Sequence, residues 1–327
     1  MLKRYKLYIS MEIENKRILI VGGTGSLGYT LNKRYIDKNK VYNMSRDESK
    51  HWKMRLTFGN HPNQAFIIGN VADSVSVSNI ILRVDPHIII IAAAMKHIDQ
   101  CETNTYESIR TNLLGTQNVL SVESPSLETV LFVSSDKACS PVNNYGMCKA
   151  MSETLLCEKA HYNSRVKFVC VRYGNVLNSN GSIIPLLHDI GKDRDAFTIT
   201  DDRMTRFIMT LEQSVDLIHH TLLYGENGDI VIPKLKSMKI RDVIEIFSEK
   251  YGKPIVKIDI RPGEKIHESL INETQSMRTI DTGKYYVIKS PISYKIVGKS
   301  ISFDYNSSSS HISKEDLAQY LTDLGLF

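Results

Sequence analysis

A tyrosine and a lysine stand four residues apart in the segment Tyr145-Gly146-Met147-Cys148-Lys149. On a helix this spacing places both side chains on one face. A lysine ammonium beside a phenol stabilises the phenolate and lowers the pKa of the tyrosine, so that the phenolate can take a proton from a hydroxyl group. The pair alone is a weak signal, and its meaning depends on the residues around it.

An acid and a base lie side by side a short distance upstream, in Ser134-Ser135-Asp136-Lys137. They follow a predicted strand, and open parallel sheets bind their ligands at the carboxyl ends of their strands. The alternative interpretation is an ion pair at the surface. The position at a strand end favours an active site formed by Ser135, Asp136 and Lys137 together with Tyr145 and Lys149.

A glycine-rich segment lies near the start of the chain, Gly22-Gly23-Thr24-Gly25-Ser26-Leu27-Gly28. Glycines allow a tight turn and a close approach to a pyrophosphate, which then lies at the positive end of the following helix. An ordinary turn is the alternative, but a strand before the segment and a helix after it favour a dinucleotide site. We expect Gly22, Thr24, Gly25, Ser26, Leu27 and Gly28 to contact the cofactor.

The end of the second predicted strand indicates which dinucleotide is bound. It reads Asn43-Met44-Ser45-Arg46. The planar guanidinium of Arg46 and the hydroxyl of Ser45 suit a 2′-phosphate, whereas Asp47 would suit a ribose hydroxyl. Arg46 could also be a solvated surface residue. The residues favour NADP over NAD.

These side chains need a sheet to position them, and the first half of the chain alternates apolar runs with helical patterns. The predicted strands are Arg17–Val21, Lys40–Met44, Ala65–Ile68, Ile88–Ala92, Val130–Ser134 and Lys167–Arg172, and the predicted helices include Ser26–Ile36, Thr105–Ser121 and Asn144–Ala160. Strands separated by helices of this length predict an α/β fold, a doubly wound parallel sheet of the Rossmann type with right-handed crossovers.

The regular alternation of predicted strands and helices ends after Asn175, where Gly, Asn and Ser cluster and the hydrophobic pattern becomes irregular. We therefore predict a Rossmann domain over residues 11–176 and a smaller substrate-binding domain over residues 177–327. Residues 1–10 are expected to form a flexible extension. The serine run Ser307–Ser310 predicts a flexible loop before a final helix, Lys314–Leu324.

Composition excludes several classes of protein. The chain has 327 residues, of which 42% are hydrophobic and 24% charged, as in globular proteins. Its formal net charge of +5 is too small to indicate nucleic-acid binding, and no apolar run is long enough for a membrane span. Five cysteines without a C-x-x-C pair predict reduced thiols in a cytoplasmic protein and no metal site.

Six motifs, in order along residues 16–305, resemble those of one family, the extended short-chain dehydrogenase/reductases that act as UDP-N-acetylglucosamine 4,6-dehydratases and invert carbon 5. The motifs are Ser45-Arg46-Asp47-Glu48, Ala92-Ala93-Ala94-Met95-Lys96-His97, Ser135-Asp136-Lys137-Ala138, Arg172-Tyr173-Gly174-Asn175-Val176, Arg203-Met204-Thr205-Arg206-Phe207 and Arg261-Pro262-Gly263-Glu264-Lys265-Ile266-His267-Glu268.

The resemblance implies an internal redox reaction. Tyr145 takes the proton of the 4-hydroxyl while NADP takes the hydride from carbon 4. Lys137 then removes the hydrogen at carbon 5, and Asp136 protonates the departing 6-hydroxyl before the hydride returns to carbon 6. Reprotonation of carbon 5 on the opposite face gives the L-configured 4-keto-6-deoxy sugar. We expect burial near Lys149 to lower the pKa of Lys137, and Asp136 to be held protonated.

The resemblance also implies further binding residues. Arg206 and Arg261 correspond to residues that clamp the diphosphate of the sugar nucleotide, with Glu264 near its ribose and Lys96 and Asn175 at the border of the site. Read alone, each charge could be a solvated one. Further cofactor contacts are expected from Asn70, Val71, Ala92, Ala93 and Ala94. His97 and His267 are expected to be structural, and Cys148 an inert packed thiol.

Two positions depart from the family pattern: Ser135 replaces a threonine, and Asn70 replaces an aspartate at the end of the third strand. Neither removes the chemistry, since Ser135 keeps the hydroxyl and Asn70 keeps a carbonyl oxygen for an adenine amino group. The expected partners are UDP-N-acetylglucosamine and further copies of the chain in a homo-oligomer. The alternatives are a UDP-sugar 4-epimerase or reductase, and a non-catalytic NADP-binding regulator.

Overall fold

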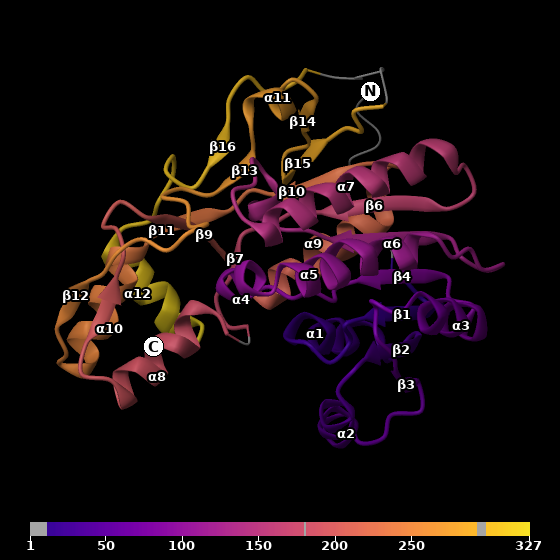
Figure 1. Ribbon diagram of the computed structural model, residues 1–327, viewed down its shortest axis with the longest axis horizontal. Helices are drawn as coiled ribbons and strands as arrows, with labels where there is room; N and C mark the ends of the chain where they lie inside the picture. The colour runs from indigo at the N-terminus through magenta and orange to yellow at the C-terminus, as the bar shows by residue number, and fades with distance from the viewer. Residues whose placement is uncertain (1–11, 180, 293–298) are drawn as a thin grey trace.

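The computed structural model describes residues 12–179, 181–292 and 299–327. It consists of a large sheet covered on both faces by helices, with a smaller lobe beside it at the left of Figure 1. The predicted extension at residues 1–10 lies outside the described residues.

The main sheet has nine strands in the order β14-β15-β10-β6-β5-β4-β1-β2-β3. Seven of them, from β10 to β3 in that order, are parallel, and β15 and β14 are antiparallel. The bounds are β1 Arg17–Val21, β2 Lys40–Ser45, β3 Gln64–Ile68, β4 Ile88–Ile91, β5 Thr129–Val133, β6 Lys167–Val171, β10 Ile230–Pro233, β14 Thr279–Asp281 and β15 Tyr285–Ile288. The predicted doubly wound sheet is confirmed, and the predicted strand ends are within one residue.

Alternating residues of each strand feed two apolar cores, one on each face. Leu19 and Val21 pack with helices α3, α6 and α7, whereas Ile18 and Ile20 pack with α1 and α9. Since both faces are covered, β4 can consist of four consecutive isoleucines, all buried. The helices around the sheet are α1 Ser26–Tyr35, α2 Glu48–Thr57, α3 Ser74–Val84, α4 Ile98–Thr103, α5 Thr105–Ser108, α6 Gly115–Leu120, α7 Asn144–Tyr162 and α9 Leu211–Tyr224.

The predicted helix Thr105–Ser121 is interrupted in the structure. Its middle, Ile109–Leu114, is a π-helical turn between α5 and α6. Such turns insert one extra residue into a helix and re-aim the side chains that follow. Here α6 then packs against the loop after β3, where Gly115 lies against the Val71 side chain.

The chain beyond residue 177 contributes to two regions. Strands β10, β14 and β15 extend the main sheet past β6. Helix α9 covers one face of that sheet, and β13 packs into the core on the other face. Most of the remaining chain forms the smaller lobe, whose apolar core draws only on residues from Leu177 onward. The elements not yet named are β7 Asn175–Val176, β8 Phe197–Ile199, β9 Thr205–Met209, β11 Lys236–Lys239, β12 Ile255–Lys257, β13 Ser269–Ile271, β16 Tyr305–Asn306, α8 Ile183–Asp193, α10 Ile240–Tyr251, α11 Glu273–Ser276 and α12 Lys314–Asp323. The division at residue 176 stays a prediction.

The serine run differs from the prediction of a flexible loop. Ser307 is fully buried, and its hydroxyl accepts a hydrogen bond from the Glu268 backbone N–H at 3.0 Å and donates to the Thr205 carbonyl at 3.1 Å. A serine can take both roles at once, so the polar run joins two segments instead of lying free. The final helix is confirmed as α12.

Among the described residues, no helix is both long and apolar enough to cross a membrane. All five cysteines are free and buried. Within the same ranges no group of three His, Cys, Asp or Glu side chains could hold a metal ion.

Candidate active site

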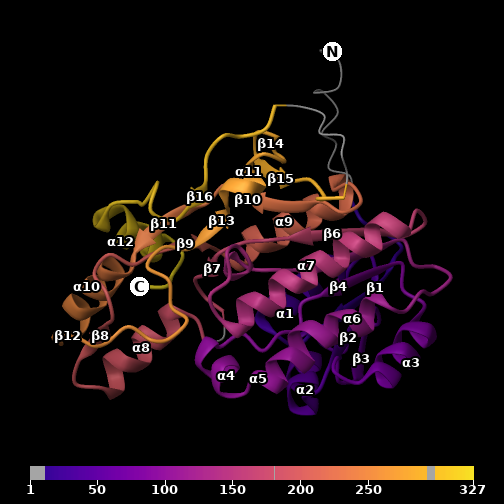
Figure 2. The ribbon, with the colours of Figure 1, turned by 45° about the horizontal axis from the view of Figure 1, so that its top comes forward.

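The predicted catalytic residues meet at the carboxyl end of β5, where the turn Asp136–Ala138 packs against the start of α7. Figure 2 shows α7 lying lengthwise along the sheet. The approach depends on Gly146, because a Cβ at this position would collide with the Lys137 carbonyl oxygen. Asn143 caps α7 by accepting a hydrogen bond from the Gly146 N–H at 2.8 Å. The first turn of α7 therefore lies directly against the acid–base pair.

Tyr145 is buried in this first turn. Burial raises its pKa to about 12, while the Lys137 charge and the Ser135 hydroxyl act in the opposite direction. The expectation of a lowered tyrosine pKa is therefore wrong for this structure. The reason is that desolvation of the phenolate outweighs the nearby positive charge.

Lys149 lies one turn further along α7 and is also buried. Its ammonium donates to the Val133 carbonyl at 2.8 Å and lies 4.5 Å from the Phe132 ring centre and 5.9 Å from the Tyr145 ring centre. Burial lowers the pKa of Lys149 to about 8. The ammonium is thus anchored to β5, whereas the positive charge that acts on the Tyr145 phenol is that of Lys137.

Lys137 lies between two buried carboxylates. Its Nζ is 3.1 Å from Asp136 Oδ1 and 3.4 Å from Glu268 Oε1. Desolvation lowers the pKa of Lys137, but Asp136 and Glu268 raise it by more, so the net shift is upward. The expected lowering is therefore wrong, because Lys137 has a second carboxylate neighbour that the upstream sequence does not show.

That neighbour, Glu268, was not among the predicted site residues. It is 2% exposed, and its carboxylate also lies 4.0 Å from Arg206 Nε and 3.9 Å from Lys265 Nζ. It belongs to the motif that begins at Arg261. Because it lies more than 130 residues from Lys137 along the sequence, no local pattern predicts their contact. Glu268 thus connects the smaller lobe to the catalytic turn.

Three acceptor oxygens in this part of the molecule are buried without a hydrogen-bond partner among the described residues. They are Asp136 Oδ2, Glu268 Oε2 and Asn175 Oδ1. The other oxygen of Asp136 accepts from the Ser135 hydroxyl at 2.8 Å and from Lys137. Buried acceptors are normally paired, so these oxygens are suited to the hydroxyl or amide donors of a bound molecule.

The glycine-rich turn has the geometry that a dinucleotide requires. Gly22 has φ +93°, and a Cβ there would lie 2.6 Å from the Ala93 backbone nitrogen, so only glycine fits. Gly25 is the N-cap of α1 and has no side-chain cap, and a Cβ there would meet only the Gly22 carbonyl at 3.4 Å. The exposed N-terminus of α1 can therefore receive a phosphate group.

At the adjacent end of β2, Arg46 is exposed and has no ion pair or side-chain hydrogen bond within residues 12–179, 181–292 and 299–327. The carboxylate of Asp47 does not point to a role in binding a ribose hydroxyl. It caps α2 instead, by accepting a hydrogen bond from the Lys50 N–H at 3.0 Å. Asn70 Oδ1 accepts from the Ala72 N–H at 3.0 Å, and Val71 is buried beside it. Among the described residues, Arg46 thus presents an exposed guanidinium without an ion pair beside the end of β2.

The predicted substrate residues form separate groups. Arg206 donates to the carbonyls of Thr205 and Ile266 at 2.8 and 3.2 Å, beside Glu268. Arg261 and Glu264 share a turn, in which the Arg261 N–H donates to Glu264 at 3.3 Å. Lys96 Nζ lies 3.4 Å from the Ser179 hydroxyl on another loop.

The Arg261–Glu264 turn is joined to the catalytic helix, since the Asn143 amide donates to the Gly263 carbonyl at 2.8 Å. The structural interpretation of His267 is supported by its 2.9 Å hydrogen-bond contact with the Thr205 hydroxyl. Burial raises the pKa of the Cys148 thiol, as expected of an inert packed cysteine.

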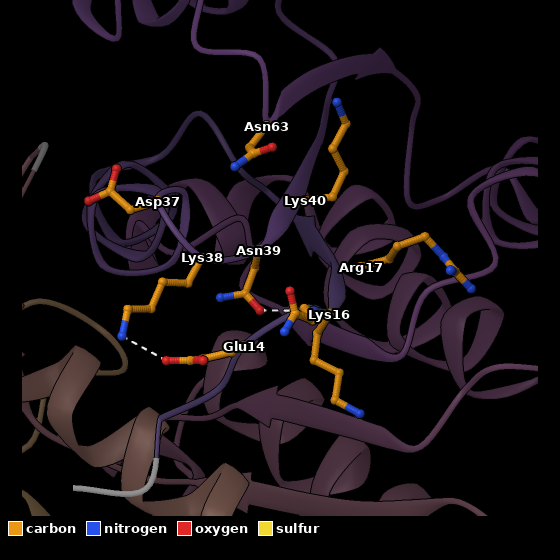
Figure 3. A pocket seen from close by; sticks show the side chains of 9 residues that line it. Glu14, Lys16, Arg17, Asp37, Lys38, Asn39, Lys40 and Asn63 are labelled. Atoms are coloured by element: carbon orange, nitrogen blue, oxygen red, sulfur yellow. Dashed lines mark hydrogen bonds and ion pairs between the residues drawn. The ribbon is translucent and has the colours of Figure 1, made fainter.

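A hollow of about 580 Å³ lies at the opposite, amino end of the strands. Figure 3 shows its charged side chains around the starts of β1 and β2, with Lys38 paired to Glu14. Lys16 pairs with Glu128 at 2.7 Å and Arg17 with Asp85 at 3.0 Å. Because these charges satisfy one another and the catalytic groups lie at the other end of the sheet, this hollow is separate from the candidate site.

The fold, the glycine-rich turn and the tyrosine–lysine helix together define an enzyme of the extended short-chain dehydrogenase/reductase class. Residues 18–290 match the model of the polysaccharide biosynthesis protein family. The chain belongs to this family.

Two curated relatives carry different names. The inverting UDP-N-acetylglucosamine 4,6-dehydratase of Campylobacter jejuni is 39% identical over 299 residues, which cover 89% of this chain and 87% of that protein. The UDP-glucose 4-epimerase of Rickettsia bellii is 39% identical over 287 residues, or 84% and 83% of the two chains. The crystal structure of Pen from Bacillus thuringiensis is 30% identical, with a TM-score of 0.91 over 97% of this chain and all of that one.

Proposed function

We propose that this protein is an NADP-dependent UDP-N-acetylglucosamine 4,6-dehydratase that inverts carbon 5. The observation that carries the proposal is the cluster in which Lys137 lies between the buried carboxylates of Asp136 and Glu268, beside the buried Tyr145. A 4-epimerase needs only a tyrosine and a lysine. Loss of water from carbons 5 and 6 needs a further base and a further acid, and this cluster supplies both.

The residues can divide the work as follows. Tyr145 accepts the proton of the sugar 4-hydroxyl in its phenolate form, which the Lys137 charge and the Ser135 hydroxyl favour against the effect of burial. A nicotinamide held at the glycine-rich turn would supply a reversible hydride acceptor. Lys137 removes the proton at carbon 5, which the neighbouring 4-ketone acidifies, and Asp136 donates a proton to the departing 6-hydroxyl.

The ion pair can prepare both of the last two groups at once. Lys137 is charged in the pair, and a charged amine is not a base. Transfer of one proton from Lys137 Nζ to Asp136 Oδ1, across 3.1 Å, makes the amine neutral and the carboxyl protonated in a single step. The same proton shift therefore creates the base for carbon 5 and the acid for the hydroxyl at carbon 6.

The second candidate function is a UDP-sugar 4-epimerase. Tyr145 and Lys149 suffice for it, and one relative of similar identity bears this name. In that case Asp136 and Lys137 would be a structural ion pair. A non-catalytic regulator is less well supported, because every group that the dehydratase reaction needs is present.

The test is incubation of the purified protein with UDP-N-acetylglucosamine, with and without added NADP, followed by NMR and absorbance. The proposal expects a 4-keto-6-deoxy product and no net change at the reduced-nicotinamide band, since the hydride is returned. UDP-N-acetylgalactosamine as the sole product would establish the epimerase instead. Steady accumulation of NADPH would indicate a simple dehydrogenase, and binding without turnover a regulator.

We also propose a homo-oligomer in the cytoplasm. Large apolar side chains are exposed on α5, the following π-helical turn and α7, namely Tyr106, Leu114, Met147 and Met151. A face of this kind supports association between copies. Sedimentation at several protein concentrations tests the oligomer, and the five free thiols are compatible with a reducing compartment.

A further inference from the structure

The hydroxyl of Ser45 lies between two other side chains. Thr24 donates to Ser45 Oγ at 3.0 Å, and Ser45 Oγ lies 2.7 Å from His51 Nε2. Thr24 belongs to the glycine-rich turn, Ser45 ends β2 and His51 is in the first turns of α2. His51 therefore connects the helix after β2 to the expected cofactor site.

The position of the His51 ring is defined by packing. It is 4% exposed, and its centre is 5.2 Å from that of Phe66 in β3. Burial lowers the pKa of His51, with Asp47 and Glu48 acting to raise it and Arg55 to lower it. The ring is thus neutral near pH 7, and one of its nitrogens donates while the other accepts.

The tautomer of His51 decides what Ser45 can offer to a ligand. A serine hydroxyl has one proton and two lone pairs, and Thr24 uses one lone pair. If Nε2 carries no proton, Ser45 must donate to it and has no proton left. If Nε2 carries the proton, Ser45 accepts from both neighbours and its own proton is free.

The two states suit different cofactors. A ribose 2′-phosphate is an acceptor of hydrogen bonds and needs a donor, whereas a ribose 2′-hydroxyl can itself donate to a serine. We propose that His51 is a positioning residue for cofactor choice: by donating Nε2–H to Ser45, it directs the serine proton toward a 2′-phosphate. This inference rests on the proposed NADP site formed by Ser45 and Arg46.

The test measures dissociation constants of NADPH and NADH by fluorescence titration, which does not depend on turnover. Two apolar variants, His51→Phe and His51→Leu, leave the Ser45 proton free but no longer directed toward the phosphate. The serine–phosphate hydrogen bond should therefore weaken, so that NADPH binds roughly 3- to 10-fold less tightly while NADH stays within about 2-fold. His51→Gln, whose side-chain amide can donate in place of the ring, should restore most of the NADPH affinity. The matched control is Trp52→Leu, an exposed position on the same helix.

A double-variant cycle with Ser45→Ala shows whether His51 acts through the serine. In the Ser45→Ala background, His51→Phe should cost NADPH binding nothing further, whereas independent effects would add. Equal losses for NADPH and NADH, or full additivity with Ser45→Ala, would overturn the role of His51 while leaving the NADP proposal intact. A wild-type protein that binds NADH as tightly as NADPH would instead remove the NADP proposal, and this inference with it.

Discussion

The two ends of the candidate active site are organised in opposite ways. At the nucleotide end, Arg46 is exposed and unpaired within the described ranges, and the N-terminus of α1 has no side-chain cap. At the catalytic end, Lys137 is held between Asp136 and Glu268, which are 1% and 2% exposed. One end leaves its charge exposed to solvent, and the other neutralises its charges internally.

The difference follows from solvent exposure. An exposed arginine without a partner lowers the stability of the folded protein very little, because water solvates its charge. A buried ammonium without a partner would cost several kcal/mol, so Lys137 requires its carboxylates in the folded protein. A substitution at the nucleotide end should therefore change affinity alone, whereas one at the catalytic end should change the protonation of its neighbours as well.

The largest effect is expected from Lys137→Met, which keeps the stem and removes the amine. Loss of a general base typically costs about 10²- to 10⁴-fold, so formation of the 4-keto-6-deoxy product and exchange at carbon 5 should both fall by this amount. The measurement is NMR of carbon 5 after reaction in deuterated water. NADPH binding should be unchanged, and it serves as the control for folding.

Deuterium that enters carbon 5 at the wild-type rate in this variant would contradict the role of Lys137 as base. Asp136 or a water molecule would then have to remove the proton. The contrast between the two ends would still stand, but the internally neutralised cluster would be structural.

An intermediate effect is expected at the nucleotide end. Arg46→Ala removes a charge-assisted contact and should weaken NADPH by roughly 10- to 100-fold, with little change for NADH. Equilibrium titration of both cofactors checks this, and Arg55→Ala on α2 is a suitable control. Equal losses for the two cofactors would show that Arg46 does not contact the 2′-phosphate.

The smallest effect is a shift in pH dependence from Glu268→Gln. Removal of one negative charge makes every proton on the Asp136–Lys137 pair easier to lose, so both limbs of the bell-shaped kcat profile should move to lower pH by about one unit. Profiles of the wild type, Glu268→Gln and the control Glu158→Gln, at an exposed position, would be compared. A uniformly lower rate with unmoved limbs would mean that Glu268 supports the fold only.

Local features of this site could be predicted from the sequence. Short continuous apolar runs locate the strands. The glycine-rich turn and the Tyr145–Lys149 spacing indicate the end of the sheet at which ligands bind. The structure brings Ser135, Asp136, Lys137, Tyr145 and Lys149 to that end of the sheet, as expected. The class of fold follows from the same local patterns.

Long-range contacts could not be predicted in this way. Glu268 approaches Lys137 because the Ser307 hydroxyl holds its backbone N–H, and neither contact leaves a periodic signal. The direction of the pKa shift of Lys137 depends on a balance between desolvation, which lowers the pKa, and two carboxylates, which raise it. One of these carboxylates, that of Glu268, is too far from Lys137 in the sequence to be predicted as its neighbour. The irregular pattern after Asn175 likewise concealed α9, a regular helix that covers one face of the sheet.

The position of β10 beside β6 has a consequence for synthesis of the chain. Until residues 230–288 leave the ribosome, the nascent sheet ends at β6 with an unpaired apolar edge, which is a template for association with other chains. The buried guanidinium of Arg172, which follows β6, also has partners from this later part of the chain. In the folded protein it donates hydrogen bonds to the Leu270 carbonyl at 2.7 Å and to the Gln275 side chain at 2.8 Å. A fragment that stops at residue 176 should therefore aggregate. For the same reason, we expect the nascent chain to depend most on chaperones between the synthesis of β6 and that of β15.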